Sequence, residues 1–166
     1  MILLLTLKAY SLRKETLMAL FDAMFEFSDN QTVTATAVAD YYIDFQDSDL
    51  EMGTGTPLYL NVKVGATAFT TGGGNDGTLT VALVYEGTDP IDTSSTVIYQ
   101  TIALAEANLT AGTWIMRMAL PVDVDKERYV GLLYTTANNI TAGTIDAWLD
   151  NGPQSSYDTQ VSESNI

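Results

Sequence analysis

Apolar and polar residues alternate through most of this chain, and the alternation predicts β-strands. It is clearest over residues 114–120, where Trp114 and Met116 share one side and Arg117 lies on the other. A period of two is typical of a strand with one buried face. Because Pro121 cannot donate a hydrogen bond to a neighbouring strand, this strand is expected to end there.

Two further strands follow, and the three segments together organise the chain. Residues 128–135 and 143–149 show the same alternation. Between them, Asn138 and Asn139 tolerate the left-handed backbone that a tight turn requires. We predict that these strands form a meander onto which the upstream segments pack.

The upstream half repeats the pattern, with turn-rich loops in between. The further predicted strands are 32–45, 58–64, 78–86 and 96–104. The first is long and rich in small residues, so a bend near Ala37 is expected. Without a helix long enough to cover a parallel sheet, these strands predict an all-β fold: a single jelly-roll-like antiparallel β-sandwich.

Shorter segments and the predicted core complete this picture. Residues 20–27 are either a short helix or an extended lead-in, and residues 105–112 are expected to form one helical turn. The inward positions of the strands predict a core that contains Tyr41, Ile43, Leu60, Val62, Val81, Leu83, Met116, Met118, Val130 and Leu132.

The two tryptophans are assigned to different environments. Trp114 falls on the buried phase of its strand and is expected in the core. Trp148 shares the polar phase of the last strand with Asp146 and Asp150, so it is expected to be exposed. An exposed ring there would suit a sugar or a protein contact.

The sequence divides into three parts. Residues 1–17 form an N-terminal extension with no strand alternation, residues 18–150 form the sandwich domain, and residues 151–166 form a polar C-terminal tail. Two interpretations of residues 1–17 stay open. Translation could begin at Met18, or the segment could be an arm that docks on a neighbouring subunit.

Charge limits the classes of partner. The chain has 21 acidic and 7 basic residues, a net charge of −14. Such a surface repels nucleic acid and anionic lipid headgroups, so neither is expected as a partner. The apolar opening run, Met1–Leu7, is too short to span a bilayer. The acidic surface either attracts a basic protein or simply keeps the protein soluble.

Residue usage argues against an enzyme. With 0 histidines and 0 cysteines, the chain lacks the usual general base, thiol nucleophile and zinc ligands. Carboxylates on the predicted strands are too sparse for the acid pair of a glycosidase. We predict no catalytic residues and no cofactor or metal.

Acidic loops are the remaining polar feature. Calcium at Asp47, Asp49 and Glu51 is the least improbable metal site, because alternate carboxylates can surround a hard cation. Asp89 with Asp92, and residues 123–127, are similar clusters. A solvated loop is the favoured interpretation of all three.

Aromatic residues near the two ends of the domain predict a protein-contact surface. A single core leaves little use for Phe21, Phe25, Phe27 and Trp148. Edge strands of an open sandwich also associate unless they are covered. Self-association as a homodimer or homotrimer is therefore expected.

Several segments together resemble a known family. They are Phe25–Gln31, Thr34–Ala37, Gly55–Leu60, Leu120–Pro121, Lys126–Tyr134 and Thr141–Thr144. In this order they are similar to the capsid cement (decoration) proteins of short-tailed bacteriophages, over residues 18–150. These segments bear the fold and contain no catalytic signature.

The resemblance implies a structural, non-enzymatic jelly-roll protein of the virion. Its partner would be the major capsid protein, on the outer surface of the assembled capsid, and it would bind there as a dimer or trimer. A carbohydrate- or receptor-binding jelly-roll module of a virion is the alternative, because the same fold serves both roles.

Overall fold

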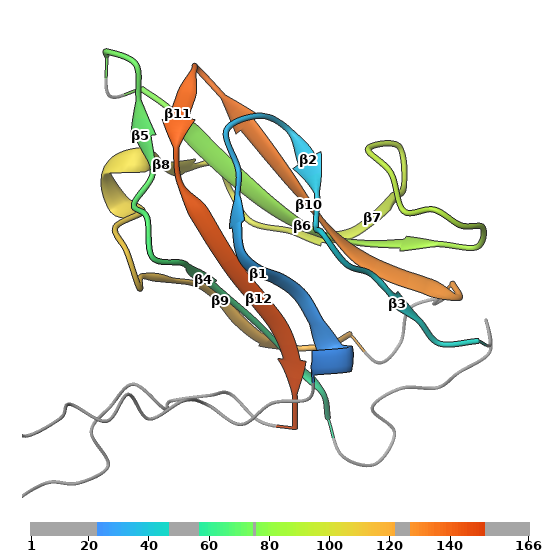
Figure 1. The fold of residues 1–166 in the computed structure, drawn as a ribbon. Coiled ribbons are helices and arrows are strands. Elements are labelled where there is room, and N and C mark those ends of the chain that lie inside the picture. Colours follow the sequence, from blue (N-terminus) through green and yellow to red (C-terminus); the bar gives the residue numbers. More distant parts are fainter. Residues whose placement is uncertain (1–22, 47–56, 75, 122–126, 152–166) are drawn as a thin grey trace, which may run out of the picture. The chain divides into compact units, whose positions relative to one another are not determined.

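The protein folds as an all-β sandwich of antiparallel sheets (Figure 1). The computed structural model describes residues 23–46, 57–74, 76–121 and 127–151. No helix of this described part is long and apolar enough to cross a membrane.

One layer, called sheet A here, holds the first and last long strands. Its order is β1 (Glu26–Thr32), β12 (Thr144–Asp150), β4 (Tyr59–Val64) and β9 (Trp114–Ala119). All neighbours are antiparallel.

The other layer, sheet B, is built around β10 (Tyr129–Ala137). On one side β10 pairs with the short strands β2 (Ala37–Val38) and β3 (Ile43–Asp44). On its other side lies β6 (Thr78–Glu86), and β6 in turn pairs with β7 (Thr96–Gln100) and β8 (Leu104–Ala105).

Small elements occupy the connections. β5 (Thr70–Thr71) pairs with β11 (Ile140–Ala142). Single 3-10 turns form at η1 (Ala23–Phe25) and η2 (Glu106–Asn108), so the helical turn expected within 105–112 is confirmed.

Successive long strands usually lie in opposite sheets, and this order defines the jelly roll. β9, β10 and β12 belong to sheets A, B and A, and only β6 and β7 are consecutive neighbours in one sheet. The predicted meander over 114–149 is therefore wrong. Alternation shows that a strand has a buried face, but it does not show which sheet that face belongs to.

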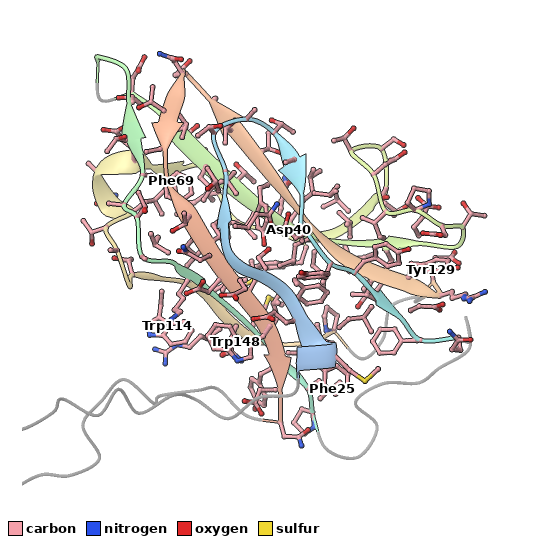
Figure 2. All side chains as sticks on the ribbon, in the orientation of Figure 1. Phe25, Asp40, Phe69, Trp114, Tyr129 and Trp148 are labelled. Carbon is pink, nitrogen blue, oxygen red and sulfur yellow. The ribbon has the colours of Figure 1, made fainter. Side chains whose placement is uncertain are left out.

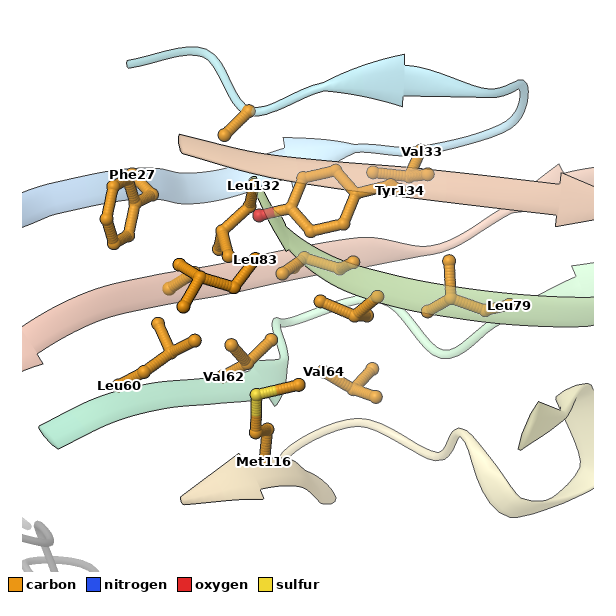
Figure 3. Packing of buried hydrophobic residues seen from close by; sticks show 14 of the residues in the cluster. Phe27, Val33, Leu60, Val62, Val64, Leu79, Leu83, Met116, Leu132 and Tyr134 are labelled. Atoms are coloured by element: carbon orange, nitrogen blue, oxygen red, sulfur yellow. The ribbon is translucent and has the colours of Figure 1, made fainter. Parts of the chain in front are cut away.

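Apolar side chains from both sheets meet in the interior (Figure 3). The predicted core is confirmed for Ile43, Leu60, Val62, Val81, Leu83, Met116, Val130 and Leu132, which are all buried. Met118 is partly buried against this cluster. Tyr41 is 59% exposed, so its assignment to the core is wrong.

Tyr41 is exposed because residues 32–45 are not one strand. β1 ends at Thr32, and the chain bends at residues 34–36, beside the position expected for the bend. The chain then crosses between the sheets: the Ala39 amide donates to the Leu132 carbonyl at 2.8 Å, and the Tyr41 amide donates to the Phe27 carbonyl at 3.0 Å. Such a crossing ends the period-2 phase.

A similar division affects residues 96–104. The predicted strand separates into β7 and β8, and Ile102 between them is 80% exposed. The Asn138–Asn139 turn is confirmed, since both residues have positive φ, 59° and 50°. These angles are in the left-handed region that asparagine tolerates.

A buried polar network joins the two sheets beside β1. Ser28 Oγ donates to Gln31 Oε1 at 2.6 Å and lies 2.7 Å from the Tyr134 hydroxyl. Gln31 Nε2 donates to the Val38 carbonyl at 2.9 Å, and the Asp40 amide donates to Gln31 Oε1 at 3.0 Å. We call this network the Gln31 clasp. Burial raises the pKa of Tyr134, although its bond to Ser28 acts in the opposite direction.

Leu83→Ala tests the core. Leu83 is fully buried, so we expect the free energy of unfolding to fall by about 2–5 kcal/mol through lost burial and a residual cavity. Urea unfolding followed by circular dichroism measures this. Tyr41→Ala is the control because Tyr41 is 59% exposed, and it should change stability by less than about 0.5 kcal/mol. Equal losses in both variants would contradict the packing described here.

Candidate interaction surface

A cluster of tyrosines, arginine and carboxylates lies where β3 meets the beginning of β10. It consists of Tyr42, Asp44, Asp89, Arg128 and Tyr129, and we call it the tyrosine–arginine cluster. The β3–β10 register places Tyr129 opposite Asp44. Figure 2 shows Tyr129 at this end of β10.

Arg128 is held in a fixed geometry. Its Nε and Nη2 atoms donate to Asp44 Oδ1 and Oδ2, both at 2.7 Å, and its guanidinium carbon lies 4.9 Å from the Tyr129 ring centroid. A bidentate bond together with ring stacking fixes a planar guanidinium better than either contact alone. The side chain remains 39% exposed.

Tyr42 forms the outer part of the cluster. Its hydroxyl donates to Asp89 Oδ1, and its ring meets the Tyr129 ring edge-on with the centroids 5.6 Å apart. The bond to the Asp89 carboxylate is the main cause that raises the pKa of Tyr42. Tyr42 is 40% exposed, whereas Tyr129 is buried, so the ring pair joins the surface to the sheet.

Below the cluster, a second apolar group supports the outer face of sheet B. It contains Ala82, Val84, Ile91, Tyr129 and Leu133, with Val38 packed against it. Ile91 comes from the β6–β7 loop, so this loop is anchored over the sheet. The cluster is therefore mounted on a packed layer, which lowers the entropy cost of binding a partner.

The chemistry of the cluster suits protein recognition. Tyrosine and arginine are enriched among the residues that dominate interface energies. Arg128 and Asp44 already neutralise each other, and Tyr42 presents both an apolar ring and a polar end. Such a surface can contact a partner without leaving a buried, unpaired charge.

A second aromatic arrangement covers the outer face of sheet A. The Trp114 and Trp148 ring centroids lie 5.8 Å apart, Arg117 stacks over Trp114 at 4.5 Å, and Lys63 lies 5.7 Å from the Trp148 centroid. Lys63 Nζ also pairs with Asp146 Oδ2 at 3.1 Å. Figure 2 shows the two tryptophans side by side, away from Tyr129.

The assignment of Trp114 to the core is wrong, and a β-bulge is the reason. Val62 pairs with Met116, but the next residue of β4, Lys63, pairs with Trp114. The extra residue, Ile115, packs against the core, and the strand phase reverses there. Trp114 consequently joins Trp148 on the outer face.

The predicted contact residues lie in different environments. Trp148 faces outward as its phase predicts, yet it is 3% exposed, so its predicted exposure is wrong. Phe27 is fully buried in the core, and Phe25 is partly buried against it. Phe21 lies outside the described residues. Phe27 and Trp148 are both covered because residues 26–32 form a sheet A strand, β1, that pairs with β12.

The acidic clusters are only partly described. Asp47, Asp49 and Glu51 lie outside the described residues, so the interpretation of that cluster as a solvated loop stays a prediction. Asp92 accepts bonds from the Ser94 amide and hydroxyl, which lower the pKa of Asp92. Among the described residues, no three acidic side chains come together in a way that could hold a metal ion.

Asp44→Asn tests the ion pair. Bonds from Arg128 are the main cause that lowers the pKa of Asp44 below its unfolded value of about 3.9. A lowered folded-state pKa stabilises the fold above the unfolded pKa, and this stability is lost as the pH falls through the folded pKa. We expect the wild type to be more stable than the variant at pH 7 and the difference to vanish in acid.

Urea unfolding between neutral and acidic pH gives the measurement. Asp29→Asn, at an exposed aspartate on β1, is the matched control and should show a smaller difference at neutral pH. If wild type and Asp44→Asn differ in unfolding free energy by the same amount at neutral and acidic pH, the Asp44–Arg128 ion pair is not the source of the difference.

Comparison with known proteins supplies the family. A search of curated proteins found no match. The family described as Bbp16 matches residues 27–149, which is well over half of the chain. Apart from Glu26 at the start of β1 and Asp150 at the end of β12, this range covers every long strand of both sheets. The chain therefore belongs to the Bbp16 family.

Proposed function

We propose that this protein binds the outer surface of an assembled phage capsid and reinforces the shell without catalysing a reaction. Support comes from the resemblance of residues 18–150 to capsid cement proteins and from the jelly-roll sandwich. The single observation that carries the proposal is the tyrosine–arginine cluster. It is a rigid, partly exposed contact surface whose polar groups are already bonded to one another.

Selective binding to the assembled state explains how such a protein would reinforce a shell. Packaged DNA exerts outward pressure, and the seams between capsomers are weak points. A ligand that binds only the assembled state stabilises it by RT ln(1 + [L]/Kd) per site, about 2.7 kcal/mol at a hundredfold excess over Kd. Many identical sites multiply this small term over the shell.

Charge would direct the encounter. A net charge of −14 favours basic patches on the shell exterior and disfavours nucleic acid and membranes. The partners we propose are the major capsid protein and further copies of this chain, as a homodimer or homotrimer on the virion surface. If exposed charges contribute to attachment, it should weaken with added salt.

The alternative, a carbohydrate- or receptor-binding module, lacks a supporting observation at the tryptophans. A sugar platform requires an open ring face. Trp148 is buried, and Arg117 is stacked over the Trp114 ring.

Shell binding is the first test. Purified protein is mixed with capsids that lack it, and with unassembled capsid subunits, and binding and resistance to heat are measured. We expect saturable binding to shells, little binding to subunits, and shells that withstand a higher temperature. Equal binding to subunits, or no gain in shell resistance, would rule out the cement role.

A matched pair of arginine variants locates the contact. Arg128→Ala removes a charge and a ring contact from the tyrosine–arginine cluster, and Arg117→Ala removes the same features from sheet A. We expect Arg128→Ala to weaken shell binding about tenfold or more, as an interface hot spot would, and Arg117→Ala to have little effect. Circular dichroism checks that both variants are folded. If Arg117→Ala weakens shell binding more than Arg128→Ala does, the contact surface lies on sheet A.

A further inference from the structure

The outer edge of sheet B is long and continuous. β7 lies at the margin of the sheet (Figure 1), and within the described residues its only strand neighbour is β6. The Thr101 amide extends this pairing by donating to the Val81 carbonyl at 2.9 Å, and β8 continues it along β6. The edge therefore runs over residues 96–105, about 33 Å at the usual rise per residue.

This edge lacks the usual chemical protection. Residues 93–105 contain no charged residue and no proline, although charged residues make up 17% of the chain. Natural edge strands are generally guarded by lysine, proline or an inward charge, because unpaired backbone groups recruit other strands. A bulge between Val97 and Tyr99 is the one guarding feature here, and it lies near one end of the edge.

Three large apolar side chains on this edge are exposed, beside the exposed polar residues Thr96 and Gln100. Val97 is 44% exposed, Tyr99 is 43% exposed and Ile102 is 80% exposed. Single exposed apolar residues are ordinary, but three within six positions of one unguarded edge indicate a surface that is covered in use.

Other margins of the sandwich differ from this one. At the opposite side, the Gln31 clasp and the Tyr41–Phe27 backbone bond join β1 to the strands of sheet B. β9, the margin of sheet A, carries the exposed Arg117. The β7–β8 edge is therefore the margin suited to pairing with another strand.

We propose that two copies of this chain associate through their β7–β8 edges, in antiparallel alignment about a two-fold axis close to Gln100. The inference rests on the self-association included in the proposed function, and it names the surface and the symmetry. Sheet B of one copy would continue into sheet B of the other.

Charge selects a second copy as the occupant. Each copy carries a net charge of −14, so most pairs of facing surfaces repel. The uncharged run over 93–105 brings two copies together without placing like charges opposite each other. Because the same edge is used by both copies, the contact is isologous and closes at two, so it produces a dimer and not a trimer.

Charge insertion tests the proposal. Tyr99→Glu would place two carboxylates near the two-fold axis, and Tyr41→Glu makes the same change at an exposed tyrosine elsewhere. By sedimentation at micromolar concentration we expect a wild-type dimer, a dissociation constant raised about tenfold or more in Tyr99→Glu, and no change in Tyr41→Glu. Wild-type monomer or trimer, or a Tyr99→Glu dimer as tight as the wild type, would overturn the inference.

Cross-linking gives a second readout that does not depend on a destabilising change. The chain has 0 cysteines, so a single introduced cysteine reports one position. Residues opposite each other in antiparallel strands have Cβ atoms about 4.5–5.5 Å apart, near the range a disulfide spans. Gln100→Cys should form a disulfide-linked dimer under mild oxidation, and Ala111→Cys, on an exposed turn, should not. Equal cross-linking of both would overturn the inference.

These outcomes are separable from those of the shell-binding test. A β7-linked dimer that does not bind shells would rule out the cement role and leave the dimer inference standing. A monomer that binds and strengthens shells would support the cement role and rule out the dimer inference.

Discussion

The buried side-chain amide of Gln31, together with the Tyr41–Phe27 backbone bond, closes this sandwich on one side. Gln31 accepts from Ser28 and the Asp40 amide and donates to the Val38 carbonyl, so one side chain joins β1 of sheet A to the β2 segment of sheet B. A buried amide that lost these partners would cost about 1–3 kcal/mol for each unsatisfied group. The crossing strand is therefore fixed in position, and Tyr41 and Tyr42 beyond it are held at the surface.

Because the Gln31 clasp closes one side of the sandwich, contacts with other molecules are left to the remaining sheet margins and surfaces. Among the described strands, β7 and β9 lie at the free margins of the two sheets, because β1 and the β2–β3 segment are joined by the clasp. β10 has neighbours on both sides and supports the tyrosine–arginine cluster at its beginning. The cluster and the β7–β8 edge belong to different parts of sheet B, so one could meet a shell while the other meets a second copy.

The sequence predicted strand existence better than strand partners. β6 was predicted with its observed ends, and β4, β9, β10 and β12 within two residues, because their alternation persists over a whole strand. Trp114 and Tyr41 were misassigned for one physical reason: a bulge in β9 and a crossing after β2 reverse or end the phase. The tyrosine–arginine cluster was missed because Asp44 and Arg128 meet only through the β3–β10 register, which no local pattern specifies. The adjacent tyrosines after Asp40 were its only local signal.

Electrostatics gives the two proposed contacts different physical characters. An acidic protein that coats a shell must approach basic capsid surfaces and also tolerate identical neighbours. A charged contact would serve the first requirement and fail the second, since like charges across an interface cost several kcal/mol. The sequence separates the two requirements: carboxylates are distributed elsewhere, and residues 93–105 have none. Salt should therefore weaken the attachment to shells but not the β7–β7 association, because apolar and backbone contacts are not screened and salt only reduces the repulsion between two copies of net charge −14.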